Sequence, residues 1–150
     1  MKQIIRLTAA LFLASIFAVS CSKKDVVKPV PAPTVKDLLT AKTWQMEEVT
    51  DNHGTPVVTY KRGAADNEED YSLVRQSFKA DGTITYVDQF GDAGTNGTYE
   101  LLENNTKIRL GMTGSSLSVV AESLSVSATR FSYRLVDQDG YVQFTFSPVQ

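Results

Sequence analysis

The chain has 150 residues, of which 42% are hydrophobic and 21% charged, and its formal net charge is −2. No cluster or stripe of lysine and arginine breaks this balance, so nucleic acid is not an expected partner. The single cysteine excludes an intramolecular disulfide and leaves no cysteine cluster for a metal. Residues 34–150 are enough for one closed hydrophobic core.

Residues 1–20 have the pattern of a secretory signal peptide. Lys2 and Arg6 form a basic start, and the apolar run 7–19 ends in the small residues Ala18-Val19-Ser20. This run is too short for a membrane-spanning helix, which needs about 20 apolar residues. We therefore expect these residues to direct export rather than to belong to the fold.

Cys21 follows the small residues directly. Its position resembles the lipobox of bacterial lipoproteins, with Ala18 where leucine is usual. The resemblance implies that Cys21 becomes the first residue of the mature chain and carries the lipid, which anchors the protein to a membrane of the cell envelope. The alternative is a free thiol after an ordinary signal.

The residues after Cys21 predict a tether. Ser22-Lys23-Lys24-Asp25 resembles the export tags of some Gram-negative lipoproteins on the outer face of the outer membrane, although a solvated charged linker fits equally well. The periplasmic and surface faces both remain open. Prolines at 29, 31 and 33 favour a polyproline II spacer, so residues 21–33 are expected to hold the domain away from the lipid.

Thr34 begins the folded domain. Thr34 and Asp37 have the spacing of a capping box, and Val35, Leu38 and Leu39 share one side of a helix of about two turns. We expect this helix to end near Ala41 or Lys42 and to cover one end of the domain with its apolar side.

The rest of the chain predicts antiparallel strands. Apolar and polar residues alternate over eight segments, with short turns such as Asp81-Gly82 between most of them. The segments are residues 44–49, 72–78, 83–89, 97–102, 107–112, 117–126, 130–137 and 141–147. Such short connections imply an up-and-down meander, and eight strands can close into a barrel without exposed edges.

One face of these strands carries the expected core. Its largest side chains line either a filled barrel or a ligand cavity, since an eight-stranded barrel allows both. They are Trp44, Met46, Phe78, Tyr86, Tyr99, Phe131, Tyr133, Phe144 and Phe146.

A short helix, a tryptophan opening the first strand and a turn-rich meander together resemble the lipocalin-like (calycin) proteins over residues 35–149. In that family a Gly-x-Trp motif opens the first strand; here Lys42 stands in the place of the glycine before Trp44. The resemblance implies that an arginine from a late strand, Arg130 or Arg134, lies over the indole. It also implies that the barrel binds a small apolar or amphipathic ligand and that the long loop 50–70 covers its mouth.

The residues offer little for catalysis. The only histidine, His53, lies in a predicted turn, so no catalytic triad can be assembled, and no phosphate-binding glycine motif is present. The acidic run 66–70 lacks the spacing of a calcium loop. We expect a non-enzymatic protein without cofactor or metal.

Two other functions remain open at this stage. A barrel filled by side chains would instead be a protein-interaction or inhibitor module that recognises an envelope partner through its loops or outer strands. A β-sandwich that recognises sugars would place Trp44 and several tyrosines on its surface. A cavity of about 300 Å³ or more would favour the ligand carrier.

Overall fold

The computed structural model describes residues 30–150, and the compact unit Ala32–Gln150 contains the fold. The predicted signal peptide, the lipidation site Cys21 and the tether up to residue 29 lie outside the described residues. Among residues 30–150, no helix combines the length and apolarity needed to cross a bilayer.

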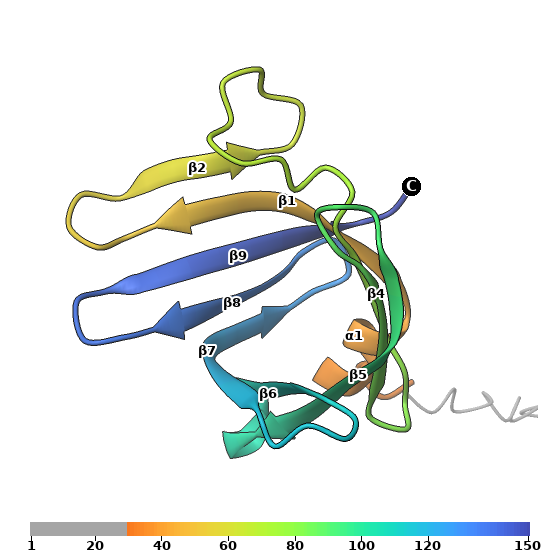
Figure 1. Cartoon of the computed structure of the whole chain (residues 1–150). Coiled ribbons are helices and arrows are strands. Elements are labelled where there is room, and N and C mark those ends of the chain that lie inside the picture. The colour runs from red at the N-terminus through yellow and green to blue at the C-terminus, as the bar shows by residue number, and fades with distance from the viewer. Residues whose placement is uncertain (1–29) are drawn as a thin grey trace, which may run out of the picture. The chain divides into compact units, whose positions relative to one another are not determined.

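The predicted fold class is confirmed: the domain is a closed, eight-stranded antiparallel barrel with one short helix (Figure 1). The ring consists of β1 (Thr43–Asp51), β3 (Arg75–Phe78), β4 (Thr83–Val87), β5 (Ala93–Leu102), β6 (Lys107–Met112), β7 (Ser118–Val126), β8 (Phe131–Val136) and β9 (Tyr141–Pro148). Neighbours in sequence pair in order, and pairing of β1 with β9 closes the ring.

A ninth strand, β2 (Val57–Lys61), lies outside this ring. The first residues of β1 pair with β3, and its last four pair with β2, while β9 runs along its other edge. The sheet therefore forks beside Met46. Arg62 closes the fork, since its Nε donates to the Met46 carbonyl at 2.7 Å and both terminal nitrogens donate to the Ser72 carbonyl at 3.2 Å.

The helix α1 (Val35–Thr40) begins with the predicted capping box. The Thr34 hydroxyl accepts from the Asp37 amide at 3.1 Å, and the Asp37 carboxylate accepts from the Thr34 amide at 2.9 Å. Leu39 is the buried residue of the helix. Its carbonyl accepts a hydrogen bond of 2.8 Å from Trp44 Nε1, which fastens the helix to the start of β1.

Two strands begin three or four residues away from the predicted position. β3 begins at Arg75 rather than 72, because Val74 N donates back to the Tyr71 carbonyl in a turn. β5 begins at Ala93 rather than 97, since the glycine-rich segment pairs with the end of β4. In the turn between β3 and β4, Gly82 has a positive φ of 90°, and the Asp81 carboxylate accepts a hydrogen bond from the Thr83 amide at 2.9 Å.

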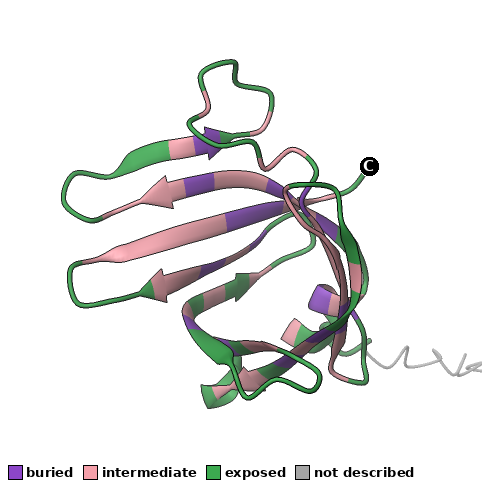
Figure 2. Ribbon diagram, in the orientation of Figure 1, coloured by how far each residue is buried: buried purple, intermediate pink, exposed green. Residues whose placement is uncertain are grey.

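Buried positions occur on the helix and on several strands (purple in Figure 2). The largest rings of the core form an aromatic cluster at the helix end of the barrel, where Trp44 bonds to Leu39 of α1. Phe131 is its centre, with ring centroids 5.7 Å from Trp44, 5.4 Å from Phe78 and 5.0 Å from Phe146. All four rings are at most 2% exposed. Side chains therefore fill this half of the barrel, and any ligand space must lie toward the other end.

Candidate functional site

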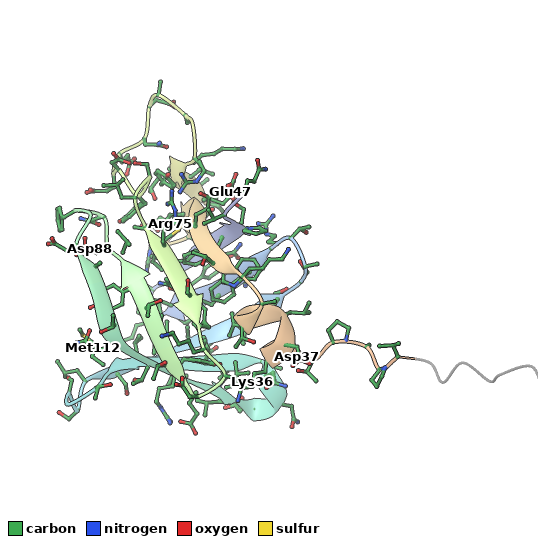
Figure 3. The ribbon with its side chains drawn as sticks, turned by 90° about the vertical axis from the view of Figure 1, so that its right-hand side faces the viewer. Lys36, Asp37, Glu47, Arg75, Asp88 and Met112 are labelled. Atoms are coloured by element: carbon green, nitrogen blue, oxygen red, sulfur yellow. The ribbon has the colours of Figure 1, made fainter. Side chains whose placement is uncertain are left out.

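An apolar pocket of about 520 Å³ lies at the end of the barrel opposite α1. Figure 3 shows Asp88, on the rim of this pocket, at the end of the domain away from Lys36 and Asp37 of the helix. Five barrel strands and the β4–β5 turn contribute to the lining. The lining residues are Met46, Tyr71, Val74, Gln76, Tyr86, Val87, Asp88, Gln89, Phe90, Tyr133 and Phe144.

Strand alternation explains why these side chains meet. Met46 is two residues beyond Trp44 on β1, and Tyr133 and Phe144 face each other across β8 and β9 with ring centroids 5.4 Å apart. Each of these three side chains is two residues along its strand from an aromatic residue of the filled core, and therefore lies on the same inner face but farther from the helix. The pocket therefore has an aromatic floor and apolar walls.

Gln76 is the polar residue on this inner face. Its register partners are Trp44 on β1 and Tyr86 on β4, both of which point into the barrel. Gln76 Oε1 is buried and has no hydrogen-bond partner. An unpaired buried acceptor costs about 1–3 kcal/mol, so the oxygen is a favourable site for a donor from a bound molecule.

The Tyr133 hydroxyl lies beside Gln76. Burial raises the pKa of Tyr133 to about 12, and a hydrogen bond from the Gln76 side chain acts in the opposite direction. Only the amide NH₂ of Gln76 can donate to a phenol oxygen and so lower its pKa. Tyr133 is therefore neutral at physiological pH, and Gln76 Oε1 has no hydrogen-bond partner.

The rim of the pocket is built by the β4–β5 turn. The Asp88 carboxylate orders this turn by accepting from the amides of Phe90 at 2.9 Å and Asp92 at 3.0 Å. Phe90 projects from the turn and is 79% exposed. Below it, Tyr86 donates to Asn96 Oδ1 at 3.1 Å and so holds its ring against the pocket wall.

The predicted site residues divide between pocket and core. Met46, Tyr86, Tyr133 and Phe144 line the pocket, whereas Trp44, Phe78, Phe131 and Phe146 form the filled half. Tyr99 also belongs to the core, with its ring edge-on to Phe78 at 5.2 Å, and its hydroxyl donates to the Lys79 carbonyl at 2.8 Å. It borders a separate hollow of about 350 Å³ that also touches Lys36.

Sequence reasoning missed Gln76, Val74 and Phe90. Gln76 is two residues before Phe78 in a predicted strand, so alternation alone already placed it on the inner face. A polar residue at such a position was the available signal. Phe90 gave a weaker signal, as an aromatic side chain isolated in a polar turn.

The implied arginine over Trp44 requires a correction. Phe131, not an arginine, packs against the indole. Arg134 lies over the Tyr141 ring, 4.3 Å from its centroid, and donates to Gln143 Oε1. Arg130 is exposed and donates to Thr145 Oγ1 at 3.3 Å. Alternation along β8 directs Phe131 and Tyr133 inward, which leaves Arg134 on the outer face.

The long loop does not cover the pocket. None of residues 50–70 lines it. Tyr60 of β2 is instead buried beside the fork, with its ring edge-on to Tyr71 at 5.5 Å, and borders a second hollow of about 520 Å³ formed by the polar loop residues. Within the described part of the chain, no group of three or more histidine, cysteine or acidic residues is placed to hold a metal ion.

A larger hollow, of about 760 Å³, lies outside the barrel. It is bordered by Lys42, Gln45, Glu47 and Arg62 together with the end of the chain from Ser147. Its lining comes from outward-facing positions of β1 and β9, so it is an open surface depression rather than an interior cavity. The smaller pocket over the aromatic floor combines a mostly apolar lining with a buried, unpaired acceptor, and we take it as the candidate site.

Comparison with known proteins adds no identification. The chain matches no protein-family model, and no curated protein is significantly similar to it.

Proposed function

We propose that this protein is a lipid-anchored lipoprotein of the bacterial envelope whose lipocalin-like barrel binds a small apolar or amphipathic ligand. The observation that carries the proposal is the pocket of about 520 Å³ over the Tyr133–Phe144 floor. This volume lies within the range of about 300–1,000 Å³ typical of small-molecule sites. Mostly apolar walls with a few polar groups are the usual composition of such a site.

The sequence supports the anchoring part of the proposal. Residues 1–20 resemble a lipoprotein signal, and Cys21 lies where the lipid would be attached. The proline-bearing segment 21–33 then acts as a spacer. We place the protein at the outer membrane, with the periplasmic or the surface face left to experiment.

A protein-interaction module is the second candidate, and one observation favours it. The β6–β7 hairpin exposes Met112, Leu117 and Val119, and Leu117 is 80% exposed. These residues border an open hollow of about 420 Å³. Clustered exposed apolar side chains often mark a surface that contacts another protein.

A fluorescence titration separates the two functions. The neutral probe N-phenylnaphthylamine is added to the domain 32–150, which contains the whole ring and its core. Saturable binding that Phe90→Ser weakens and Leu117→Ser leaves unchanged would support the carrier. The two side chains are matched in exposure, at 79% and 80%, but only Phe90 lines the pocket. Absence of saturable binding would remove the carrier and leave the interaction module.

A further inference from the structure

We infer that the pocket selects neutral ligands whose polar end donates a hydrogen bond to Gln76 Oε1, and that it discriminates against carboxylates and phosphates. The inference rests on the proposed function, because it specifies what the same pocket binds. It depends on three independent features: an unpaired acceptor, a neutral phenol beside it and the charges around the site.

The acceptor is held in place before any ligand arrives. Gln76 lies in the middle of the short strand β3, between its partners Trp44 and Tyr86, so its backbone cannot move without disturbing the pairing of β3 with both β1 and β4. Oε1 is shielded from solvent and unpaired. A ligand hydroxyl or N–H group would satisfy this oxygen, whereas an ether or a hydrocarbon would leave it unsatisfied.

The Tyr133 side chain lines the same pocket as Gln76. Burial raises the pKa of its phenol to about 12, and a hydrogen bond from the Gln76 side chain opposes this shift. The phenol is neutral, so it can serve as a second hydrogen-bonding group for a ligand hydroxyl. Together the two side chains match an alcohol or an N–H group.

The charges around the pocket exclude an anion. Its one charged lining residue is Asp88, an acid, and no lysine or arginine contributes to the lining. Two arginines of the neighbouring segments are committed elsewhere: Arg62 donates to the carbonyls of Met46 and Ser72, and Arg75, next to Gln76 in the sequence, donates to the carbonyls of Ser72 and Val74. A carboxylate entering this site would lose its hydration without gaining a cation.

The volume of the pocket limits the size of the apolar part of the ligand. About 520 Å³ over an aromatic floor accommodates a single alkyl chain or a pair of fused rings, not a whole diacyl lipid. Phe90 on the rim extends the apolar surface for the distal part of such a ligand. The expected ligands are therefore medium-chain alcohols, and aromatic amines or phenols of similar size.

Two matched sets of compounds test the inference with the domain 32–150. N-phenylnaphthylamine carries one N–H group, and anilinonaphthalene sulfonate has the same ring skeleton with an added anionic group. Decanol, decyl methyl ether and decanoate share one alkyl chain and differ in the polar end. Each decyl compound is titrated against bound N-phenylnaphthylamine below its aggregation concentration.

The expected order is decanol, then the ether, then decanoate. Decanol should compete about five- to tenfold better than the ether, since only the alcohol can donate to Oε1. Gln76→Met, which keeps the side-chain length but removes the amide, should reduce that ratio to about one. Gln45→Met is the matched control, because it replaces the same residue type on the outer face of β1. This variant should leave the ratio of alcohol to ether competition unchanged.

The outcomes separate the two proposals. If N-phenylnaphthylamine binds but decanoate competes as well as decanol, or the ether as well as the alcohol, the inference is wrong and the carrier stands. If neither probe nor any decyl compound binds, the carrier itself is wrong. Should Gln76→Met fail to fold, the ranking of the three decyl compounds on the unaltered domain still decides the question.

Discussion

The ring of Tyr86 lies directly over Gly94 on the neighbouring strand, in the space that a β-carbon at position 94 would occupy. The two residues are register partners across β4 and β5. Because position 94 has no side chain, the Tyr86 ring can lie flat against the strand, reach Asn96 with its hydroxyl and form one wall of the pocket. A glycine thus determines the shape of the candidate site.

Gly94→Ala should displace the Tyr86 ring and destabilise the domain by about 1–3 kcal/mol, the usual cost of an added methyl group in a packed site. Urea unfolding followed by circular dichroism measures the change. Gly111→Ala is the control, because a β-carbon there would meet Thr98 Oγ1 at 3.2 Å and require only a small shift. Equal stability losses for the two variants would contradict this account of Tyr86.

Trp44→Ala should lower the free energy of unfolding by about 3–5 kcal/mol, because the indole is fully buried against Phe131. Trp44→Phe keeps a ring but removes the donor to the Leu39 carbonyl, and its effect should be smaller. Urea unfolding of both variants measures the difference. A loss below about 1 kcal/mol for Trp44→Ala would show that the indole is not part of the core.

Arg62→Leu should destabilise the domain by about 1.5–3 kcal/mol, since it leaves the Met46 carbonyl without its charged donor and removes one of the two arginines that donate to the Ser72 carbonyl. Arg109→Leu serves as the comparison. Arg109 pairs with Glu100 on the exposed surface of β5 and β6, where an ion pair contributes about 0–1 kcal/mol. Thermal or urea unfolding of the two variants should therefore give clearly different losses. Similar losses would mean that the fork does not depend on Arg62.

His53 makes the stability of the domain depend on pH. Its Nδ1 lies 2.7 Å from Asp51 Oδ1 and its Nε2 lies 2.9 Å from Asp137 Oδ2, so it joins the β1–β2 turn to the β8–β9 turn. Hydrogen bonds to Asp51 and then Asp137 raise the pKa of His53 above its ordinary 6.5. The hydrogen bonds from His53 lower the pKa of both carboxyls below 3.8.

The sign of each shift defines the pH window. A raised pKa of His53 contributes stability below pH 6.5 that is lost as the pH rises through the folded value. The lowered carboxyl pKa values contribute stability above pH 3.8 that is lost on further acidification. His53→Gln should therefore cost most stability between these two limits. An imidazole pKa at or below 6.5 by NMR titration would contradict the bridge.

Cys21→Ser should abolish incorporation of radiolabelled palmitate into the protein, because the thiol is the attachment atom for the lipid in the proposed lipoprotein. Ser22→Ala keeps the thiol and should incorporate label as the unaltered chain does. Labelling of growing cells followed by immunoprecipitation measures both. Palmitate retained by Cys21→Ser would rule out lipidation at this position.

The amino-acid sequence by itself determined the local structure and the face of each strand. Alternation with a period of two depends on neighbouring residues only, so it correctly predicted the eight strands of the ring and the inward direction of Met46, Tyr133 and Phe144. The capping box of Thr34 and Asp37 is equally local. These features need no knowledge of the rest of the chain.

Only the tertiary structure decided the position of each side chain along the barrel axis. Tyr99 and Tyr133 have the same pattern in sequence, yet one lies near the helix and the other lines the pocket. The free oxygen of Gln76, the exclusion of β2 from the ring and the contact of His53 with Asp137 all depend on register between distant segments. Register follows from closure of the whole sheet and from how the side-chain volumes fill it, and no local pattern encodes either.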